Sequence, residues 1–262
     1  PEHSAAETLQ RLDIHLPGPL TLVHEPRRGI PVARNAAVRA TTPSTDAIAF
    51  VDDDETPDPR WITALLDTRD ATHADVVTGP VRPRFDITPP DWLDANRHFH
   101  GPDHPHHARL DRAFTGNVLA DARLLRETPF DESAPLAGGT DSQLFQTLHR
   151  RGAEIRWAAD ALVHEHIPAS RLTPAWLRRR AFRDGITMSR LARYFDPGPR
   201  PWIIQPAKAA AWLGIAAART LALPLGPRRH ALHAARHAAY AAGLLAGLAR
   251  YQYHEYARTH GR

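Results

Sequence analysis

The sequence contains no cysteine, and this absence removes several kinds of chemistry from consideration. A chain without thiols has no disulfides, no zinc sites with thiolate ligands and no cysteine nucleophile. Any metal ion must therefore be held by carboxylates, histidines or both. The residues given also lack a basic segment followed by an apolar run, so they contain no secretory signal. A cytoplasmic location is the default expectation, which the lack of cysteine suits.

Long apolar runs are missing as well. A membrane-spanning helix needs about 18 or more nearly uninterrupted apolar residues, and Lys208, Arg219 and Arg236 interrupt the candidates near the C-terminus. We therefore expect amphipathic helices that lie at an anionic membrane surface rather than helices that cross it. Such helices would make the protein peripheral at the inner face of the plasma membrane.

The basic residues lack the arrangement that is typical of nucleic-acid-binding proteins. The formal net charge is +4, arginine supplies far more of the positive charge than lysine, and the basic residues concentrate after residue 170 without interleaved aromatics. We therefore expect no nucleic-acid partner. The planar guanidinium of arginine suits phosphorylated ligands and anionic lipid surfaces equally well.

The chain of 262 residues changes character near residue 170. Before that point, short apolar runs alternate with helical patterns, which predicts an α/β domain with a largely parallel sheet over residues 1–170. The expected strands are Leu20–His24, Ile48–Asp52, Asp75–Val81 and Ala161–His166, and the expected helices are Pro31–Ala40, one opening at Asp58-Pro59, and Thr140–Arg151. Residues 171–262 predict a helical C-terminal extension, with helices at Leu172–Tyr194, Ile203–Leu223 and Leu232–Tyr256.

Four consecutive acidic residues, Asp52-Asp53-Asp54-Glu55, follow the second expected strand and precede a helix with Asp58 as its expected N-cap. Ligands of open α/β sheets bind at such strand exits. Crowded carboxylates repel one another unless a cation neutralises them, and Mg²⁺ or Mn²⁺ takes oxygen ligands of this kind. The alternative is a solvated acidic turn that caps the following helix.

Several motifs in fixed order carry a family resemblance. They are Gly29-Ile30-Pro31-Val32-Ala33-Arg34-Asn35-Ala36-Ala37, Ile48 to Pro57, Trp61-Ile62, Gly79-Pro80-Val81, Pro89-Pro90-Asp91-Trp92, Thr115-Gly116-Asn117-Val118-Leu119, Phe130-Asp131, Gly138-Gly139-Thr140-Asp141 and Ile167-Pro168-Ala169-Ser170-Arg171. Over roughly residues 20–190, the set resembles the inverting family 2 glycosyltransferases of GT-A fold. It is most similar to their succinoglycan-type exopolysaccharide glucosyltransferases.

The resemblance implies that an acceptor hydroxyl attacks the anomeric carbon of a UDP-sugar and inverts its configuration. By family position, Asp52 and Asp54 would form the Asp-x-Asp pair that binds Mg²⁺ or Mn²⁺, and Asp141 would be the general base. Asp52 and Asp53 would also contact the nucleotide-sugar. An ionised carboxylate at Asp141 is favoured by the positive end of the expected helix dipole. The acceptor would be a glycan or a lipid-linked saccharide.

Two departures from the family pattern stand out. Thr140 replaces the glutamate that usually precedes the base, and this threonine could instead be the helix N-cap. The opening strand of the family, with the aspartate that grips uracil, has no counterpart in the sequence. We therefore expect a GT-A domain that is incomplete at its N-terminus.

Other candidate residues have structural alternatives. Arg34 and Asn35 could reach a donor phosphate, or Arg34 could form a surface salt bridge. Gly116 and Asn117 could line the sugar pocket, or form a turn that needs no ligand. His164 is a candidate third metal ligand, which alternation places on the same face as His166.

The histidine-rich segment His98–His107 is interpreted as a flexible loop on the acceptor side rather than as a metal site, because proline and glycine interrupt it. Arg178, Arg179, Arg180 and Arg183 could bind phosphate or form a solvated helix face.

The sequence therefore predicts a metal-dependent hexosyltransferase. Two other functions remain open at this point. One is a nucleotidyltransferase, although no glycine-rich phosphate loop is present. The other is a catalytically inactive protein that binds a sugar nucleotide or a membrane.

Overall fold

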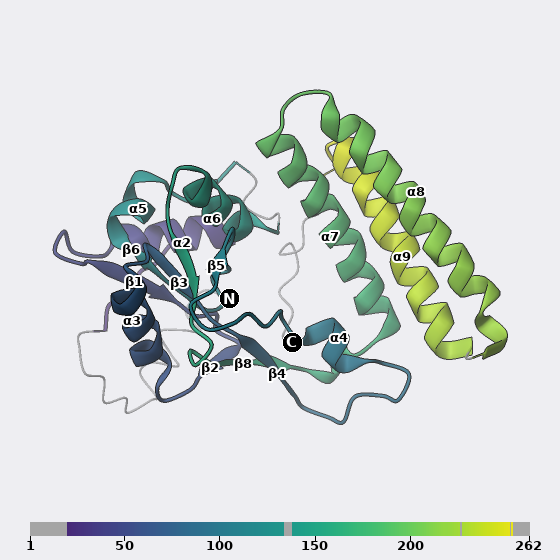
Figure 1. Cartoon of the computed structure of the whole chain (residues 1–262), viewed down its shortest axis with the longest axis horizontal. Helices are drawn as coiled ribbons and strands as arrows, with labels where there is room; N and C mark the ends of the chain where they lie inside the picture. The colour runs from purple at the N-terminus through teal and green to yellow at the C-terminus, as the bar shows by residue number, and fades with distance from the viewer. Residues whose placement is uncertain (1–19, 134–137, 226, 252, 254–262) are drawn as a thin grey trace.

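The computed structural model describes residues 20–133, 138–225, 227–251 and 253, in which an α/β region is followed by three long helices (Figure 1). The elements of the α/β region are α2 (Ile30–Arg39), β1 (Ala47–Phe50), β2 (Glu55–Pro57), α3 (Trp61–Thr72), β3 (Val76–Thr78), β4 (Val81–Phe85), α4 (Ala95–Phe99), β5 (Arg109–Leu110), β6 (Val118–Asp121), α5 (Ala122–Glu127), α6 (Thr140–Arg150), β7 (Ile155–Trp157), β8 (Val163–Ile167) and the 3₁₀ turn η1 (Ala169–Arg171). The helical region consists of α7 (Pro174–Phe195), α8 (Arg200–Leu221), the 3₁₀ turn η2 (Leu223–Leu225) and α9 (Pro227–Leu248).

The larger sheet has five strands in the order β1-β6-β3-β7-β5. Only its β3–β7 pair is parallel, because β6 runs antiparallel between β1 and β3 and β5 pairs antiparallel with β7. The prediction of a largely parallel sheet is therefore wrong for the described residues. The sequence pattern predicts no strand at β5 or β6, and these two strands run opposite to β1, β3 and β7.

Both faces of this sheet are covered, which explains why its strands are apolar runs rather than alternating patterns. Val76 and Val118 face the cluster that Leu144, Phe145 and Leu148 of α6 complete. Their neighbours in sequence, Val77 and Leu119, face the opposite cluster with Leu65 of α3. Successive residues of a strand point to opposite faces, so one short strand contributes to two cores.

The second sheet brings Glu55, the last of the four consecutive acidic residues, opposite Glu165. Its order is β2-β8-β4, with β2 antiparallel and β4 parallel to β8. In this register Glu55 is paired with Glu165, and His164 lies between Thr56 and Arg82. Glu55, the last residue of the turn Asp52–Glu55 (here called the acidic turn), therefore lies beside Glu165.

Several predicted boundaries need correction. Leu20–His24 contains no strand, and no described strand pairs with it. Asp58 is not the N-cap of α3. Its carboxylate accepts a hydrogen bond from the Arg60 amide, and the helix begins later, at Trp61. Gly139, not Thr140, is the N-cap residue of α6.

The predicted helices of the C-terminal region are confirmed, with boundaries that differ by one to eight residues. The last helix ends at Leu248 rather than Tyr256, and Arg250 has a positive φ of 60°. Residues 254–256 of the predicted helix lie outside the described part of the chain, as does any opening strand before residue 20. The start of α7 follows a standard pattern, since the Thr173 hydroxyl accepts from the Trp176 amide and Pro174 occupies the first turn.

Glycines allow α7 and α9 to approach backbone to backbone. A Cβ atom at Gly185 would lie 2.3 Å from the Tyr240 carbonyl oxygen, and one at Gly243 would lie 2.0 Å from the Phe182 carbonyl oxygen. The Ser189 hydroxyl donates to the Leu244 carbonyl across the same contact, at 2.6 Å. α8 then packs on the other side of α9 (Figure 1). None of the helices that the structure describes is long and apolar enough to cross a membrane.

The helical region is joined to the α/β region by a shared apolar cluster. Leu93 and Ile167 pack with Leu177 of α7 and Leu232 of α9. Phe99 of α4 stacks on Trp176 with ring centroids 5.7 Å apart. The architecture changes between β8 and α7, close to the predicted limit at residue 170. The division into two domains stays a prediction, because the two regions are packed together there.

Candidate active site

The acidic turn follows β1 and closes on itself. The Glu55 amide donates to the Asp52 carbonyl oxygen at 3.1 Å, and the Asp52 amide donates to Glu55 Oε2 at 2.9 Å. The second hydrogen bond holds the Glu55 carboxylate close to the backbone of the turn and next to Gly116. A Cβ atom at position 116 would lie 2.5 Å from Glu55 Oε1, so a larger residue there would displace the Glu55 carboxylate. Asp53 and Asp54 occupy the two middle positions of the turn.

Two arginines from distant segments neutralise part of this charge. Arg34 of α2 contacts Asp52, with Nη2 and Oδ1 2.9 Å apart. Arg171 of η1 bridges two carboxylates, since its Nη2 lies 2.8 Å from Asp54 Oδ2 and its Nη1 lies 2.8 Å from Glu165 Oε1. Asp52 and Asp54, the two candidate carboxylate ligands, therefore each have an arginine partner.

The remaining negative charge is still crowded. Burial, reinforced by the neighbouring carboxylates of Asp52, Glu165 and Asp54, raises the pKa of Glu55 to about 8. Burial also raises the pKa of Asp52, against the opposing effect of Arg34, and it raises the pKa of Glu165. Burial is the largest cause at all three positions, and the neighbouring carboxylates add to it.

Asp141 lies close enough to this cluster to contribute to its electrostatics. Its charge is among those that raise the pKa of Asp52, although the two residues are far apart in sequence. Asp141 occupies the first turn of α6, where its Oδ1 accepts from the Ser142 amide at 2.7 Å. This hydrogen bond orients the carboxylate that the sequence predicts as the general base.

The turn that carries Asp141 is fixed by α7. Arg190 donates to the Gly138 carbonyl oxygen at 2.9 Å and to Gln143 Oε1 at 2.5 Å. Gln143 in turn donates to Asp131 Oδ2. Gly139 has a φ of +80°, and a Cβ atom there would lie 2.3 Å from Thr187 Cγ2. The helical region therefore helps to position the candidate base.

The acidic turn has the chemistry of a divalent-cation site. Carboxylate oxygens suit Mg²⁺ or Mn²⁺, and a bound cation would relieve the crowding that raises the pKa of Asp52 and Glu55. No group of three histidine or acidic side chains among the described residues is already arranged to hold a metal ion. The assignment of Asp52 and Asp54 as a pair of metal ligands stays a prediction.

His164 is less well placed as a third ligand. Adjacent residues of β8 point to opposite faces, so His164 lies on the face opposite Glu165, whose carboxylate shares Arg171 with Asp54. His166 shares the face of His164, as predicted, and its ring contacts the Asp86 carboxylate. The role of His164 as a metal ligand stays a prediction, and this register does not support it.

Asn35 and Asn117 are held by the protein itself. The Asn35 amide exchanges two hydrogen bonds with the backbone of Phe130. Asn117 is 1% exposed, accepts from the indole of Trp61, and donates to the carbonyl oxygens of Pro80 and Ala161. These contacts favour the alternative of a structural asparagine at both positions, and a role in binding the nucleotide-sugar stays a prediction.

The histidine-rich segment is distributed over several contacts. His98 lies in α4 and accepts a hydrogen bond from Arg236 of α9, 2.8 Å away. The His104 ring packs on Trp157, and His106 accepts from the Ala159 amide. The segment thus contacts both the α/β and the helical regions instead of forming one loop apart from them.

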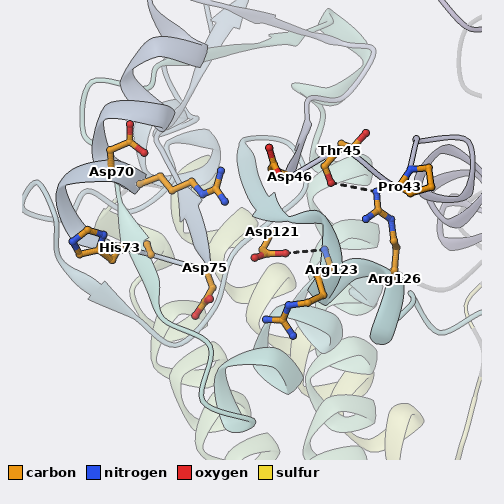
Figure 2. A pocket seen from close by; sticks show the side chains of 11 residues that line it. Pro43, Thr45, Asp46, Asp70, His73, Asp75, Asp121, Arg123 and Arg126 are labelled. Carbon is orange, nitrogen blue, oxygen red and sulfur yellow. Dashed lines mark hydrogen bonds between the residues drawn. The ribbon is translucent and has the colours of Figure 1, made fainter.

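A polar cavity of about 660 Å³ lies at the other end of β1 (Figure 2). Asp46 precedes β1 and Asp75 precedes β3, whereas Asp121 ends the antiparallel strand β6. Arg126 on its rim already donates to the carbonyl oxygens of Thr42 and Thr45. This cavity is separate from the acidic turn, which follows the opposite end of β1.

Comparisons with known proteins identify the family of the chain. A family model described as glycosyl transferase family 2 matches residues 3–133. The succinoglycan biosynthesis protein ExoM of Rhizobium meliloti (strain 1021) is 36% identical over 251 residues, which cover 93% of this chain and 80% of ExoM. A pre-mycofactocin glycosyltransferase of Mycobacterium tuberculosis (strain ATCC 25618 / H37Rv) is 27% identical over 203 residues, 74% of this chain and 42% of that protein.

Solved structures give a more distant likeness. The crystal structure of S. aureus TarS 1–349 in complex with UDP aligns with a TM-score of 0.38 and 12% sequence identity, over 81% of this chain and 69% of that one. The chain belongs to glycosyl transferase family 2, and its α/β region has the GT-A fold.

Proposed function

We propose that this glycosyltransferase transfers a hexose from a UDP-sugar to a glycan or lipid-linked saccharide, with inversion, in the synthesis of an exopolysaccharide. The observation that carries the proposal is the proximity of two carboxylate sites, the acidic turn and Asp141. One site suits a donor diphosphate and the other suits an acceptor hydroxyl. The similarity to the succinoglycan biosynthesis protein supports the class of product.

In this proposal the two sites have separate tasks. Asp141 accepts the proton of the acceptor hydroxyl while the oxygen attacks the anomeric carbon from the side opposite the departing UDP. Asp52 and Asp54 would hold Mg²⁺ or Mn²⁺, which when bound neutralises the charge that develops on the diphosphate. Arg34 is poised beside Asp52 to add a charge-assisted hydrogen bond to a phosphate oxygen.

The substitution Asp141→Asn tests this assignment. It keeps the size of the side chain and removes the base, so UDP release in the presence of acceptor should fall by about a thousandfold or more. Mn²⁺-dependent UDP binding, measured by calorimetry, should remain within about threefold of the original because the acidic turn is intact. Asp160→Asn, at an exposed turn, is the matched control and should turn over normally.

Three results would count against the proposal. Unchanged turnover in Asp141→Asn removes Asp141 as the base. Release of pyrophosphate from a nucleoside triphosphate and sugar phosphate would indicate the nucleotidyltransferase instead. Binding of UDP-sugar by the unmodified protein, without turnover on any acceptor of a saccharide panel, would indicate the inactive binding protein.

A further inference from the structure

The outward surface of α8 is an apolar face that no described part of the chain covers. Its inner side packs on α9 through Gln205, Ala209 and Ala216. The opposite side is formed by six exposed residues that recur every three or four positions, here called the outer stripe: Ile203, Ala207, Ala210, Gly214, Ala217 and Leu221. Ile203 is 71% exposed and Leu221 is 84% exposed, and α8 lies on the side of α9 away from the α/β region (Figure 1).

The charge around the outer stripe has one sign. Residues 197–254 contain seven basic residues and no acidic residue. Three of the basic residues, Arg200, Lys208 and Arg219, belong to α8 itself. The exposed side chain of Trp202 lies beside the stripe near the start of the helix. By helical spacing Arg200 lies next to the stripe, whereas Lys208 and Arg219 lie about 140° or more around the helix from its middle. An apolar surface with a basic side chain and an aromatic ring at one end is a combination found on helices that lie in the interface of anionic membranes.

We propose that the outer stripe of α8 docks on an anionic lipid bilayer, with the helix parallel to the membrane surface. The aliphatic side chains at its ends would enter the boundary between headgroups and acyl chains, while Arg200 contacts lipid phosphates. The parallel orientation is expected because no described helix can cross the bilayer.

A second copy of the chain is the main rival occupant of this face. The small residues in the middle of the stripe would allow two α8 helices to approach closely. However, two copies related by a twofold axis would bring two identical basic surfaces together without any acid in residues 197–254 to balance them. A membrane that carries phosphatidylglycerol supplies the missing negative charge. Charge complementarity therefore favours the lipid surface.

Vesicle co-sedimentation of the full chain tests the proposal without requiring activity. Vesicles with about three parts phosphatidylcholine to one part phosphatidylglycerol should bind the protein, and phosphatidylcholine alone should bind it at least about tenfold more weakly. The double variant Ile203→Glu/Leu221→Glu should lose about tenfold or more in affinity for the anionic vesicles. The control Leu66→Glu/Ile87→Glu adds the same charge at two other exposed apolar positions and should bind like the original.

Depth of insertion gives a second readout. Lipids with brominated acyl chains should quench the fluorescence contributed by Trp202, obtained as the difference from Trp202→Phe, because the ring lies beside the stripe. The proposal is overturned if the two double variants bind anionic vesicles equally, or if Trp202 is not quenched. It is also overturned if analytical ultracentrifugation shows a dimer that Ile203→Glu/Leu221→Glu dissociates while vesicle binding is unchanged. Turnover on a soluble acceptor is independent of these outcomes.

Discussion

Arg171 acts as an internal counter-ion for two carboxylates that come from different strands and turns. Its side chain is about one-quarter exposed, as is that of Glu165, while Asp54 is somewhat more accessible. Ion pairs at such depth are only partly screened by solvent. Removal of one partner therefore leaves a partly buried charge unpaired and lowers the free energy of unfolding. The same guanidinium competes with any cation that would bind Asp54.

Arg171→Ala should therefore have two opposite effects. Without added metal, the free energy of unfolding should fall by about 1–2 kcal/mol, because Asp54 and Glu165 lose their shared partner. With Mn²⁺, the melting temperature of the variant should rise by more than that of the original protein, because the competing cation is absent. Thermal denaturation with and without Mn²⁺ measures both effects. Arg123→Ala, which removes a pair on the surface of α5, is the control. Equal Mn²⁺ shifts in all three proteins would contradict a metal site at Asp54.

The parts of the site that could be predicted from the sequence are those whose signal is local. Four acids directly after an apolar run mark a strand exit, and Asp141 follows a glycine pair that opens a helix. The partners of these residues could not be predicted in the same way. Arg171 lies 117 residues from Asp54, and Arg190 lies 52 residues from Gly138. Only the folded chain brings these arginines to their acceptors.

At the scale of elements, the contact between α7 and α9 depends on the absence of side chains at a few positions. Gly243 faces the Phe182 carbonyl at a distance that leaves no room for a methyl group. At Gly214 of α8, in contrast, a Cβ atom would meet no atom of another described segment within 4 Å. Both residues are helical, so the intrinsic cost of glycine in a helix is similar at the two sites.

Alanine at these two glycines should have effects of opposite sign. Gly214→Ala should stabilise the protein by about 0.5–1 kcal/mol, through helix propensity alone. Gly243→Ala should destabilise it by about 1–3 kcal/mol, because the two helices must move apart to accept the methyl group. Urea denaturation followed by circular dichroism gives both free energies. A stabilising effect of Gly243→Ala would show that the close contact is absent in solution.

Elements were predictable in proportion to their length. The long helices are periodic over many turns, and their existence was correctly predicted even where their ends were not. Strands β2, β5 and β7, which were not predicted, have only two or three residues, too few to show a period. The place of β6 between β1 and β3 is set by burial on both faces of the sheet, and no property of Val118–Asp121 alone indicates it.

At the scale of the whole molecule, buried histidines lie where the helical region meets the α/β region. His98 of α4 and His233 of α9 have ring centroids 5.6 Å apart. Burial lowers the pKa of each to about 4, and it also lowers the pKa of His237. The charged groups around them are Arg97, Arg219 and Arg236, with Asp94 as the opposing acid. Protonation of these histidines would therefore add positive charge to a positive environment.

The stability of the molecule should consequently fall with pH in a defined range. A histidine whose pKa is lowered on folding is neutral in the folded protein, so its contribution to stability is present above pH of about 6.5 and is lost as the pH falls toward 4. The slope is at most about 1.4 kcal/mol per pH unit for each histidine. Urea denaturation between pH 7 and pH 5 should give a shallower slope for His233→Gln than for the original protein. His149→Gln, at an exposed position, should leave the slope unchanged; equal slopes in all three would argue against this interpretation.

The two arginines at the acidic turn affect how the protein should respond to a chelator. Structural metal centres tie folding to the ion, so chelators unfold the proteins that contain them. Here Arg34 and Arg171 pair with Asp52 and Asp54, so we expect the turn to fold without an ion. Exposure to a chelator during purification should leave the chain folded, and any metal-dependent activity should return when the ion is added back.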